Sequence, residues 1–221
     1  MSRDFSVETK TASAVSLHAF DPPDRPQPTL VVAEVRDAAL VLGSAQRDSV
    51  IDQARVNNGD YAVVRRRSGG GSVWLSPGDQ VWVDVWIPAG HRLWNDDVVR
   101  AALPIGEAWS QALQATGFAS LEVHDGGVEA TTWSSLVCFA GRGPGEVIDT
   151  AGRKWVGLSQ RRTREWIRLQ TMTHRVWDPA RAVDGLRLSP HEREQVANEL
   201  ADAVGTVGSA DVLPRLVDAL G

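Results

Sequence analysis

Three observations predict an α+β protein with mixed or antiparallel β-sheets flanked by helices. First, QVWVDVWIP (80–88) alternates with period 2, placing Val81, Val83, Val85 and Ile87 on one face, as a strand does. Second, short β-rich runs occupy 30–35, 38–43 and 61–66. Third, helical patterns return from Ser189 onward. Strands in the middle of the chain with helices around them are typical of the α+β class.

The first half of the chain contains three further predicted elements. Residues 1–29 are polar and include DPPDRPQPT, which predicts an extended N-terminal arm with one short strand at Val15–Phe20. Residues 44–59 begin with Ser, Gln and Asp and end with Asn-Asn-Gly, which predicts a short helix. A longer helix is predicted from Asn95, as its N-cap, to Thr116, because Gly117 follows.

The second half predicts further strands and, over 189–221, a short helical extension of the same domain. FASLEVHDGGVEATTW (118–133) predicts a β-hairpin that turns at 125–127, and SLVCFA (135–140) predicts a strand. Residues 147–174 predict a long hairpin that turns at Thr150–Arg153. The extension opens with Ser189 followed by Pro190 at the first helical position.

Composition excludes several classes of protein. The 28 acidic and 23 basic residues give a net charge of −5, which argues against a general nucleic-acid binder. No window approaches the roughly 18 apolar residues of a membrane span, and MSRDFSVETK has no signal-peptide core. The single cysteine, Cys138, excludes an internal disulfide and favours the reducing cytoplasm. The five histidines lack zinc-ligand spacing, so no metal site is expected.

The segment RRRSGGGSV (65–73) follows a predicted strand and is suited to hold an anion. Glycines leave backbone N–H groups accessible to a ligand, and guanidinium groups match phosphate. The same residues also suit a flexible turn beside a solvated edge. They match neither a Walker loop nor a Rossmann turn.

A second basic segment, GRKWVGLSQRRTREWIR (152–168), holds six basic residues against one acid. On a strand, Lys154 shares a face with Val156 and Leu158. A lysine among apolar neighbours predicts burial beside an anion, unless the side chain extends to solvent from a strand edge.

Together the two segments resemble the lipoate–protein ligase A family, within the biotin/lipoyl ligase fold. The RRxSGGGxV signature reads Arg65 to Val73 here, and the GxKxxGxxQ stretch reads Gly152 to Gln160. LVLGSAQ (40–46) resembles the strand end before the signature, with a Gly and a Gln at the pocket rim. The resemblance covers about 30–188, which it implies is the acyl-ligase or transferase catalytic domain.

This resemblance implies an enzyme that activates lipoate or octanoate with ATP and Mg²⁺ to an acyl-adenylate. The acyl group would then pass to a lysine on the lipoyl domain of a 2-oxoacid dehydrogenase or on a glycine cleavage carrier protein. Lys154 would act near the acyl carbonyl and the phosphate. The nucleotide- and acyl-binding residues implied are Arg66, Ser68, Gly69, Gly70, Gly71, Ser72, Val73, Trp74, Gly152 and Gly157.

Cys138 leaves two alternatives open. Octanoyltransferases of the same superfamily carry a nucleophilic cysteine in a CFxxxxxxE-like stretch, and Cys138-Phe139 with Glu146 resembles it. Such an enzyme takes octanoyl from acyl carrier protein as a thioester and needs no ATP. A lone cysteine in VCFA is also typical of a small core residue. A non-catalytic ligand-binding module, or the partner subunit of a split ligase, is the alternative of another class.

Overall fold

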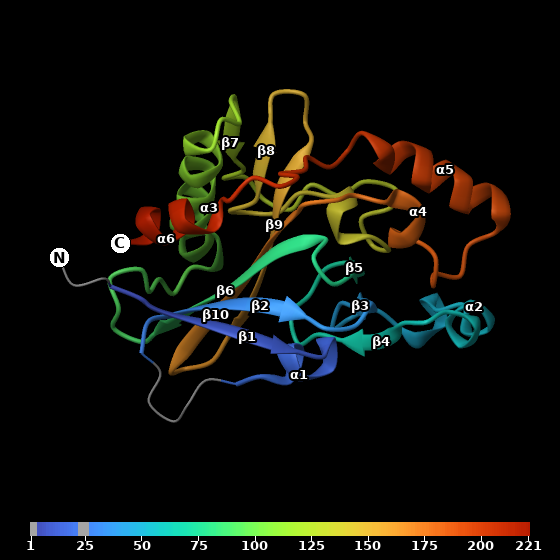
Figure 1. Ribbon diagram of the computed structural model, residues 1–221, viewed down its shortest axis with the longest axis horizontal. Coiled ribbons are helices and arrows are strands. Elements are labelled where there is room, and N and C mark those ends of the chain that lie inside the picture. The colour runs from blue at the N-terminus through green and yellow to red at the C-terminus, as the bar shows by residue number, and fades with distance from the viewer. Residues whose placement is uncertain (1–3, 22–26) are drawn as a thin grey trace.

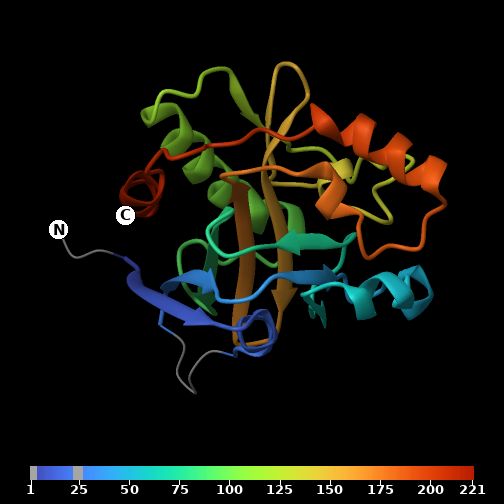
Figure 2. The ribbon, with the colours of Figure 1, turned by 45° about the vertical axis from the view of Figure 1, so that its right-hand side comes forward.

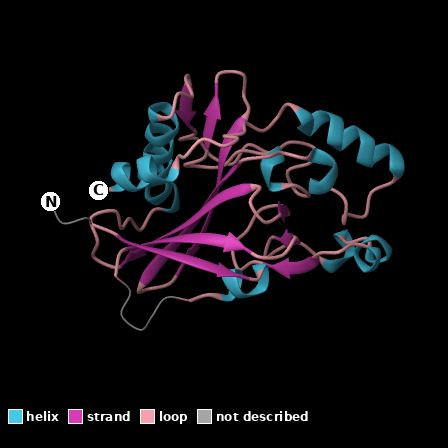
Figure 3. Cartoon of the chain, viewed as in Figure 1, coloured by secondary structure: helices cyan, strands magenta, loops and turns pink. Residues whose placement is uncertain are grey.

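The computed structural model describes residues 4–21 and 27–221, which form two sheets flanked by helices (Figures 1 and 3). The seven-stranded sheet has the order β1-β2-β6-β10-β9-β8-β7, and a three-stranded sheet has the order β4-β3-β5. The predicted α+β class with mixed sheets is confirmed. The strands are β1 Ser6–Ala12, β2 Thr29–Val35, β3 Ala39–Leu42, β4 Ala62–Arg65, β5 Val73–Leu75, β6 Gln80–Pro88, β7 Leu121–Val123, β8 Val147–Asp149, β9 Lys154–Arg162 and β10 Trp166–His174. The helices are α1 Ala14–Ala19, α2 Gln53–Asn58, α3 Val98–Ala115, α4 Pro179–Ala182, α5 Pro190–Ala201 and α6 Leu213–Leu220, with 3₁₀ turns η1 Asp48–Val50 and η2 Cys138–Ala140.

Strand β6 is the centre of the large sheet, and both of its faces are buried. It pairs antiparallel with β2 on one side and β10 on the other. Val83, Val85 and Ile87 belong to the main core, where α3 packs. Trp82 and Trp86, on the opposite face, belong to two smaller clusters. The alternation predicted for 80–88 is therefore correct, but neither face meets water.

Helices α3 and α6 lie at one end of the molecule and α2, α4 and α5 at the other, while α1 lies between them beside β1 and β4 (Figure 1). Helix α3 contacts α6 and the β7–β9 end of the large sheet, whereas α4 and α5 contact each other beside the small sheet. The N-cap of α3 is Asp97, whose carboxylate accepts from the amides of Val99 and Arg100, so the predicted cap at Asn95 is wrong by two residues. Among the described residues no helix has the length and apolar character to cross a bilayer.

The N-terminal segment is more structured than predicted. Residues 6–12 are extended, but as β1 they pair in parallel with β2 at the edge of the large sheet. The predicted strand at Val15–Phe20 is wrong, because these residues lie largely in α1 (Figure 2). The Ser13 side chain caps this helix by accepting from the Ser16 amide at 3.2 Å. The Pro-rich piece falls mainly on 22–26, which lie outside the described residues.

Two other local predictions are wrong because tertiary partners take the hydrogen bonds. The predicted hairpin at 118–133 does not form, since β7 pairs with β8 instead. The predicted strand at 135–140 is a loop ending in η2, because Ser72 bridges Val137 in parallel and Gln46 takes the carbonyls of Ser135 and Leu136. The helix predicted over 44–59 is only the short η1 and α2. The turn at 150–153 and the helix capped by Ser189 are confirmed. Residues 147–174 are not one long hairpin, however, because the chain turns again at 163–165 and β9 pairs antiparallel with β10.

A buried ion pair ties α1 to the two central strands. The Asp84 carboxylate on β6 accepts from Arg168 Nε at 2.8 Å and from Trp82 Nε1 at 2.7 Å. Arg168, 2% exposed, also donates to the carbonyl oxygens of Leu17 and Phe20 at the end of α1. Burial raises the pKa of the Asp84 carboxyl, and the Arg168 guanidinium opposes that rise. Arg168 therefore caps a helix inside the protein and does not belong to a solvated basic surface.

Replacing Arg168 with Met is expected to destabilise the fold by about 3–5 kcal/mol, because it leaves a buried carboxylate without its cation. Urea unfolding at neutral pH measures this. Arg161 pairs with Arg168 across β9 and β10, and its own partner is the half-exposed Asp21. Arg161→Met, the matched control, is expected to cost less than about 1 kcal/mol. Equal costs for both variants would contradict a buried role for Arg168.

Candidate active site

The loop between β4 and β5 is shaped by the side chain of Arg66, which folds back onto it. Its guanidinium donates to the carbonyl oxygen of Gly69 at 2.6 Å and to that of Gly71 at 2.8 Å. Between them Gly70 has a φ of +94°, a conformation that favours glycine. Arg66 is only 4% exposed. The signature arginine thus supports the glycine backbone directly.

The segment LVLGSAQ closes one rim of this loop, as predicted. A Cβ on Gly43 would lie 1.9 Å from the carbonyl oxygen of Gly70, so the two backbones meet where only glycine fits. Gln46 accepts from the Gly43 amide at 2.9 Å and donates to the Ser135 carbonyl at 2.9 Å. In the described chain the amides of residues 69–71 donate no backbone hydrogen bond, so they are free for a ligand.

The ammonium of Lys154 is buried at the start of β9 and has three acceptors. It donates to the carbonyl oxygens of Cys138 at 3.0 Å and Gly141 at 3.1 Å, and it forms an ion pair with Glu146 Oε1 at 2.7 Å. Glu146 also accepts from the amides of Gly143 and Leu158. The predicted burial of Lys154 beside an anion is correct, and the anion is a carboxylate of the same chain.

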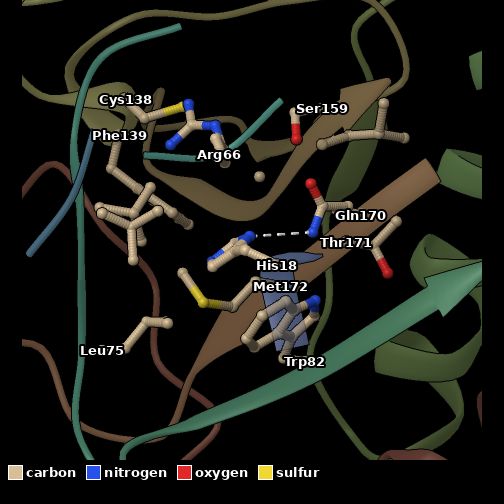
Figure 4. A pocket seen from close by; sticks show the side chains of 14 residues that line it. His18, Arg66, Leu75, Trp82, Cys138, Phe139, Ser159, Gln170, Thr171 and Met172 are labelled. Atoms are coloured by element: carbon tan, nitrogen blue, oxygen red, sulfur yellow. Dashed lines mark hydrogen bonds between the residues drawn. The ribbon is translucent and has the colours of Figure 1, made fainter. Parts of the chain in front are cut away.

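Two cavities meet at Cys138. The first, about 50 Å³, is mostly apolar and is shown in Figure 4. The second, about 760 Å³, is wider and more polar, and Lys154 and Gly69–Gly71 both line it. Cys138 is half-buried and lines both. The lining of the narrow cavity includes His18, Arg66, Leu75, Trp82, Gln170 and Met172.

Most of the predicted site residues come together at these cavities. The wide cavity gathers Lys154, Cys138 and the three signature glycines, while Arg66, Val73 and Gly157 line the narrow one. Ser68 lies beside them, with its hydroxyl 2.9 Å from that of Ser159 on β9.

Like Ser68, three further predicted residues do not line either of these cavities. The Trp74 indole packs edge-on against Tyr61 over a separate hollow. The Ser72 hydroxyl is fully buried and donates to the Leu136 carbonyl at 2.8 Å. Gly152 lies in the β8–β9 turn with a φ of +82°, where its carbonyl accepts from Arg142.

Two residues of the narrow cavity carry no sequence signal. His18 belongs to the segment predicted as a strand of the N-terminal arm. In the structure it lies in α1 beside Trp82, with ring centroids 4.7 Å apart. Burial, with Arg168 and Arg66 nearby, lowers the pKa of His18 to about 3. Gln170 lies mid-strand in β10, and its amide nitrogen is 3.4 Å from His18 Nδ1. Only the pairing of distant segments puts them together.

Comparison with known proteins gives the family to which this fold and site belong. The family model for the lipoyl protein ligase A/B catalytic domain matches residues 11–204, so the chain belongs to this family. No curated protein matches the sequence.

Solved structures of lipoate ligases share the fold at low identity. A bi-partite lipoate protein ligase from Thermoplasma acidophilum, reported with its E2 lipoyl domain, is 16% identical with a TM-score of 0.70, over 98% of this chain and 80% of that chain. A putative lipoate protein ligase from the same organism, with bound lipoic acid, is 15% identical with a TM-score of 0.68, over 100% and 83%. A lipoate-protein ligase A bound with ATP is 14% identical with a TM-score of 0.65, over 100% and 83%.

Substituting Gly70 with Ala is expected to disorganise the loop, because the new Cβ would lie 2.9 Å from Arg66 Nη2 in a left-handed backbone. Gly69→Ala is the matched control, since a Cβ there meets nothing within 4 Å. We expect Gly70→Ala to weaken binding of ATP by about tenfold or more, and Gly69→Ala to weaken it less, as measured by calorimetry. Equal affinities in two folded variants would contradict this account of the loop.

Stability should fall in acid because of His174. It is buried between Phe139 and Trp177, and burial, with Lys154 nearby, lowers its pKa to about 3. The unfolded chain binds the proton from about pH 6.5 downward, so His174 lowers the free energy of unfolding by up to about 1.4 kcal/mol per pH unit between about 6.5 and 3. Urea unfolding across this range should show a shallower slope for His174→Phe, and no change for the exposed His191→Phe.

Proposed function

We propose that this protein activates lipoate or octanoate with ATP and transfers the acyl group to a lysine of a lipoyl carrier domain. The observation that carries the proposal is that Lys154 and Gly69–Gly71 line one cavity, although the sequence separates them by more than eighty residues. Family membership and the lipoate- and ATP-bound neighbours support it. Carrier domains of 2-oxoacid dehydrogenases or of glycine cleavage are the proposed acceptors.

In the first half-reaction a carboxylate oxygen of the acid attacks the α-phosphorus of ATP, and pyrophosphate leaves. Free amides at 69–71 and the Arg66 guanidinium are suited to hold the phosphate. The described residues include no cluster of three or more His, Cys, Asp or Glu for a metal ion, so we assign no protein ligand to Mg²⁺.

In the second half-reaction the acceptor lysine amine attacks the acyl carbonyl, and AMP leaves. Negative charge grows on the carbonyl oxygen, and Lys154 is the group suited to offset it. For this the ammonium exchanges the Cys138 or Gly141 carbonyl for a ligand oxygen, while Glu146 keeps it in place. The acyl chain would occupy the narrow cavity. Gly157 lets the Phe139 ring pack directly against β9 in the wall of that cavity, since a Cβ would lie 2.9 Å from the ring.

The position of Cys138 favours a second candidate, an octanoyltransferase that uses no ATP. A Cβ on Gly70 would lie 3.3 Å from Cys138 Sγ and 2.9 Å from Arg66 Nη2, so thiol and guanidinium approach the same point where the cavities meet. The Cys138 thiolate would attack the thioester of octanoyl-acyl carrier protein and release the carrier's thiol. The acceptor lysine amine would then displace Cys138 from the new thioester.

Two incubations separate the candidates. With ATP and lipoate or octanoate, the ligase yields AMP and an acyl-adenylate, detected by mass spectrometry. With octanoyl-acyl carrier protein, the transferase gains an octanoyl group on Cys138, seen in the intact mass and absent in Cys138→Ser. Ligand binding with neither product would instead support a non-catalytic module or a partner subunit, and would exclude both enzymatic proposals.

Replacing Lys154 with Met is expected to reduce acyl transfer by about 100-fold or more, because the developing charge loses its counter-ion. The substitution also leaves Glu146 buried without a cation, so Lys154→Met combined with Glu146→Gln should recover stability but not activity. Arg153→Met is the control, since that side chain is half-exposed and pairs with Asp149. Near-normal turnover in the folded double variant would remove the proposed role.

A further inference from the structure

His18 presents an unpaired ring nitrogen to the narrow cavity. The residue is 8% exposed, and its ring lies against Trp82. Nε2 makes no hydrogen bond within residues 4–21 and 27–221. A buried polar atom without a partner is costly, and here it lines a cavity rather than a closed core.

The hydrogen-bond network shows that this nitrogen is a donor. An amide nitrogen only donates, so Gln170 Nε2 donates to His18 Nδ1 at 3.4 Å. The Ser68 hydroxyl donates to the other end of the same amide, Gln170 Oε1, at 3.2 Å. The ring is neutral near pH 7, because its pKa is about 3. Its one proton therefore lies on Nε2.

Arg66 supplies a second unmatched donor to the same cavity. Its Nη1 has no hydrogen-bond partner, and no carboxylate of the described residues lies within ion-pair distance of its guanidinium. Arg66 stands at the Cys138 end, whereas His18 stands with Trp82 and Met172 (Figure 4). The cavity thus has a buried cation near one end and a neutral N–H donor further along an otherwise largely apolar wall.

We propose that the preferred acyl substrate of this cavity is a medium-chain carboxylic acid that carries a hydrogen-bond acceptor on its chain, such as an oxo or hydroxy group. The carboxylate would face Arg66 and the chain acceptor would face His18 Nε2. This rests on the proposed acyl-transfer function and names its substrate class. A plain methylene against Nε2 would bury the N–H without an acceptor, and sites built to hydrogen-bond a ligand reject analogues that lack the partner group.

Binding of free acids without ATP tests the proposal, with calorimetry as the readout. The probes are octanoate, 7-oxo-octanoate, 8-hydroxyoctanoate and lipoate, whose sulfur atoms are weak acceptors. We expect wild-type protein to bind at least one of the two oxygenated acids about tenfold more tightly than octanoate, with lipoate between them. His18→Phe keeps an aromatic ring against Trp82 but removes the donor, so the preference should disappear. His18→Gln restores an N–H donor and should recover part of it.

His91→Phe is the control, because His91 packs on Phe5 outside the cavity, and it should keep the wild-type preference. Equal or tighter binding of octanoate by wild-type protein overturns the inference and leaves acyl transfer standing. Persistence of the preference in folded His18→Phe also overturns it. Failure of every acid to bind overturns the acyl pocket itself, and the proposed function with it. The order of affinities of the wild-type protein for the four acids tests the inference even if a variant does not fold.

Discussion

The arrangement of the site depends on the hydrogen bonds and the ion pair made by the ammonium of Lys154. It joins the start of β9 to the irregular segment 138–146 by two carbonyl contacts and a buried ion pair. That segment has little regular structure of its own to fix its position. A buried lysine requires its acceptors to remain close, so the segment is held as the wall between the two cavities, and Cys138 is held where they meet.

Close contact between two backbone segments positions the loop between β4 and β5 on the other side of the site. Two contacts hold the signature loop in place. The Arg66 guanidinium donates to the loop carbonyls, and the backbone of Gly43 lies against that of Gly70. Any side chain on Gly43 would push the loop away from Gln46 and the segment it binds. Glycine is needed here mainly for close packing of two backbones, and Gly70 needs its positive φ as well.

The buried pair of Asp84 and Arg168 extends this order to the N-terminus. Through the carbonyls at the end of α1, it sets where His18 enters the narrow cavity. A residue that lines the narrow cavity is thus positioned by an ion pair on the same face of the sheet as Trp82, Gln170 and Met172. The polar network Ser159–Ser68–Gln170–His18 then runs along that wall, linking the signature loop to β9, β10 and α1.

The sequence by itself determined the elements whose stabilising contacts are local. The period-2 pattern of β6, the turn at 150–153 and the Ser189 cap were predicted because alternation, turn chemistry and capping act over a few residues. The two motifs also identified Lys154 and the glycines together. Only the tertiary structure decided that 135–140 forms a loop, that β7 pairs with β8, and that α1 brings His18 to the narrow cavity. In each case the hydrogen-bond partner lies far away in the chain, and short-range pattern carries no information about it.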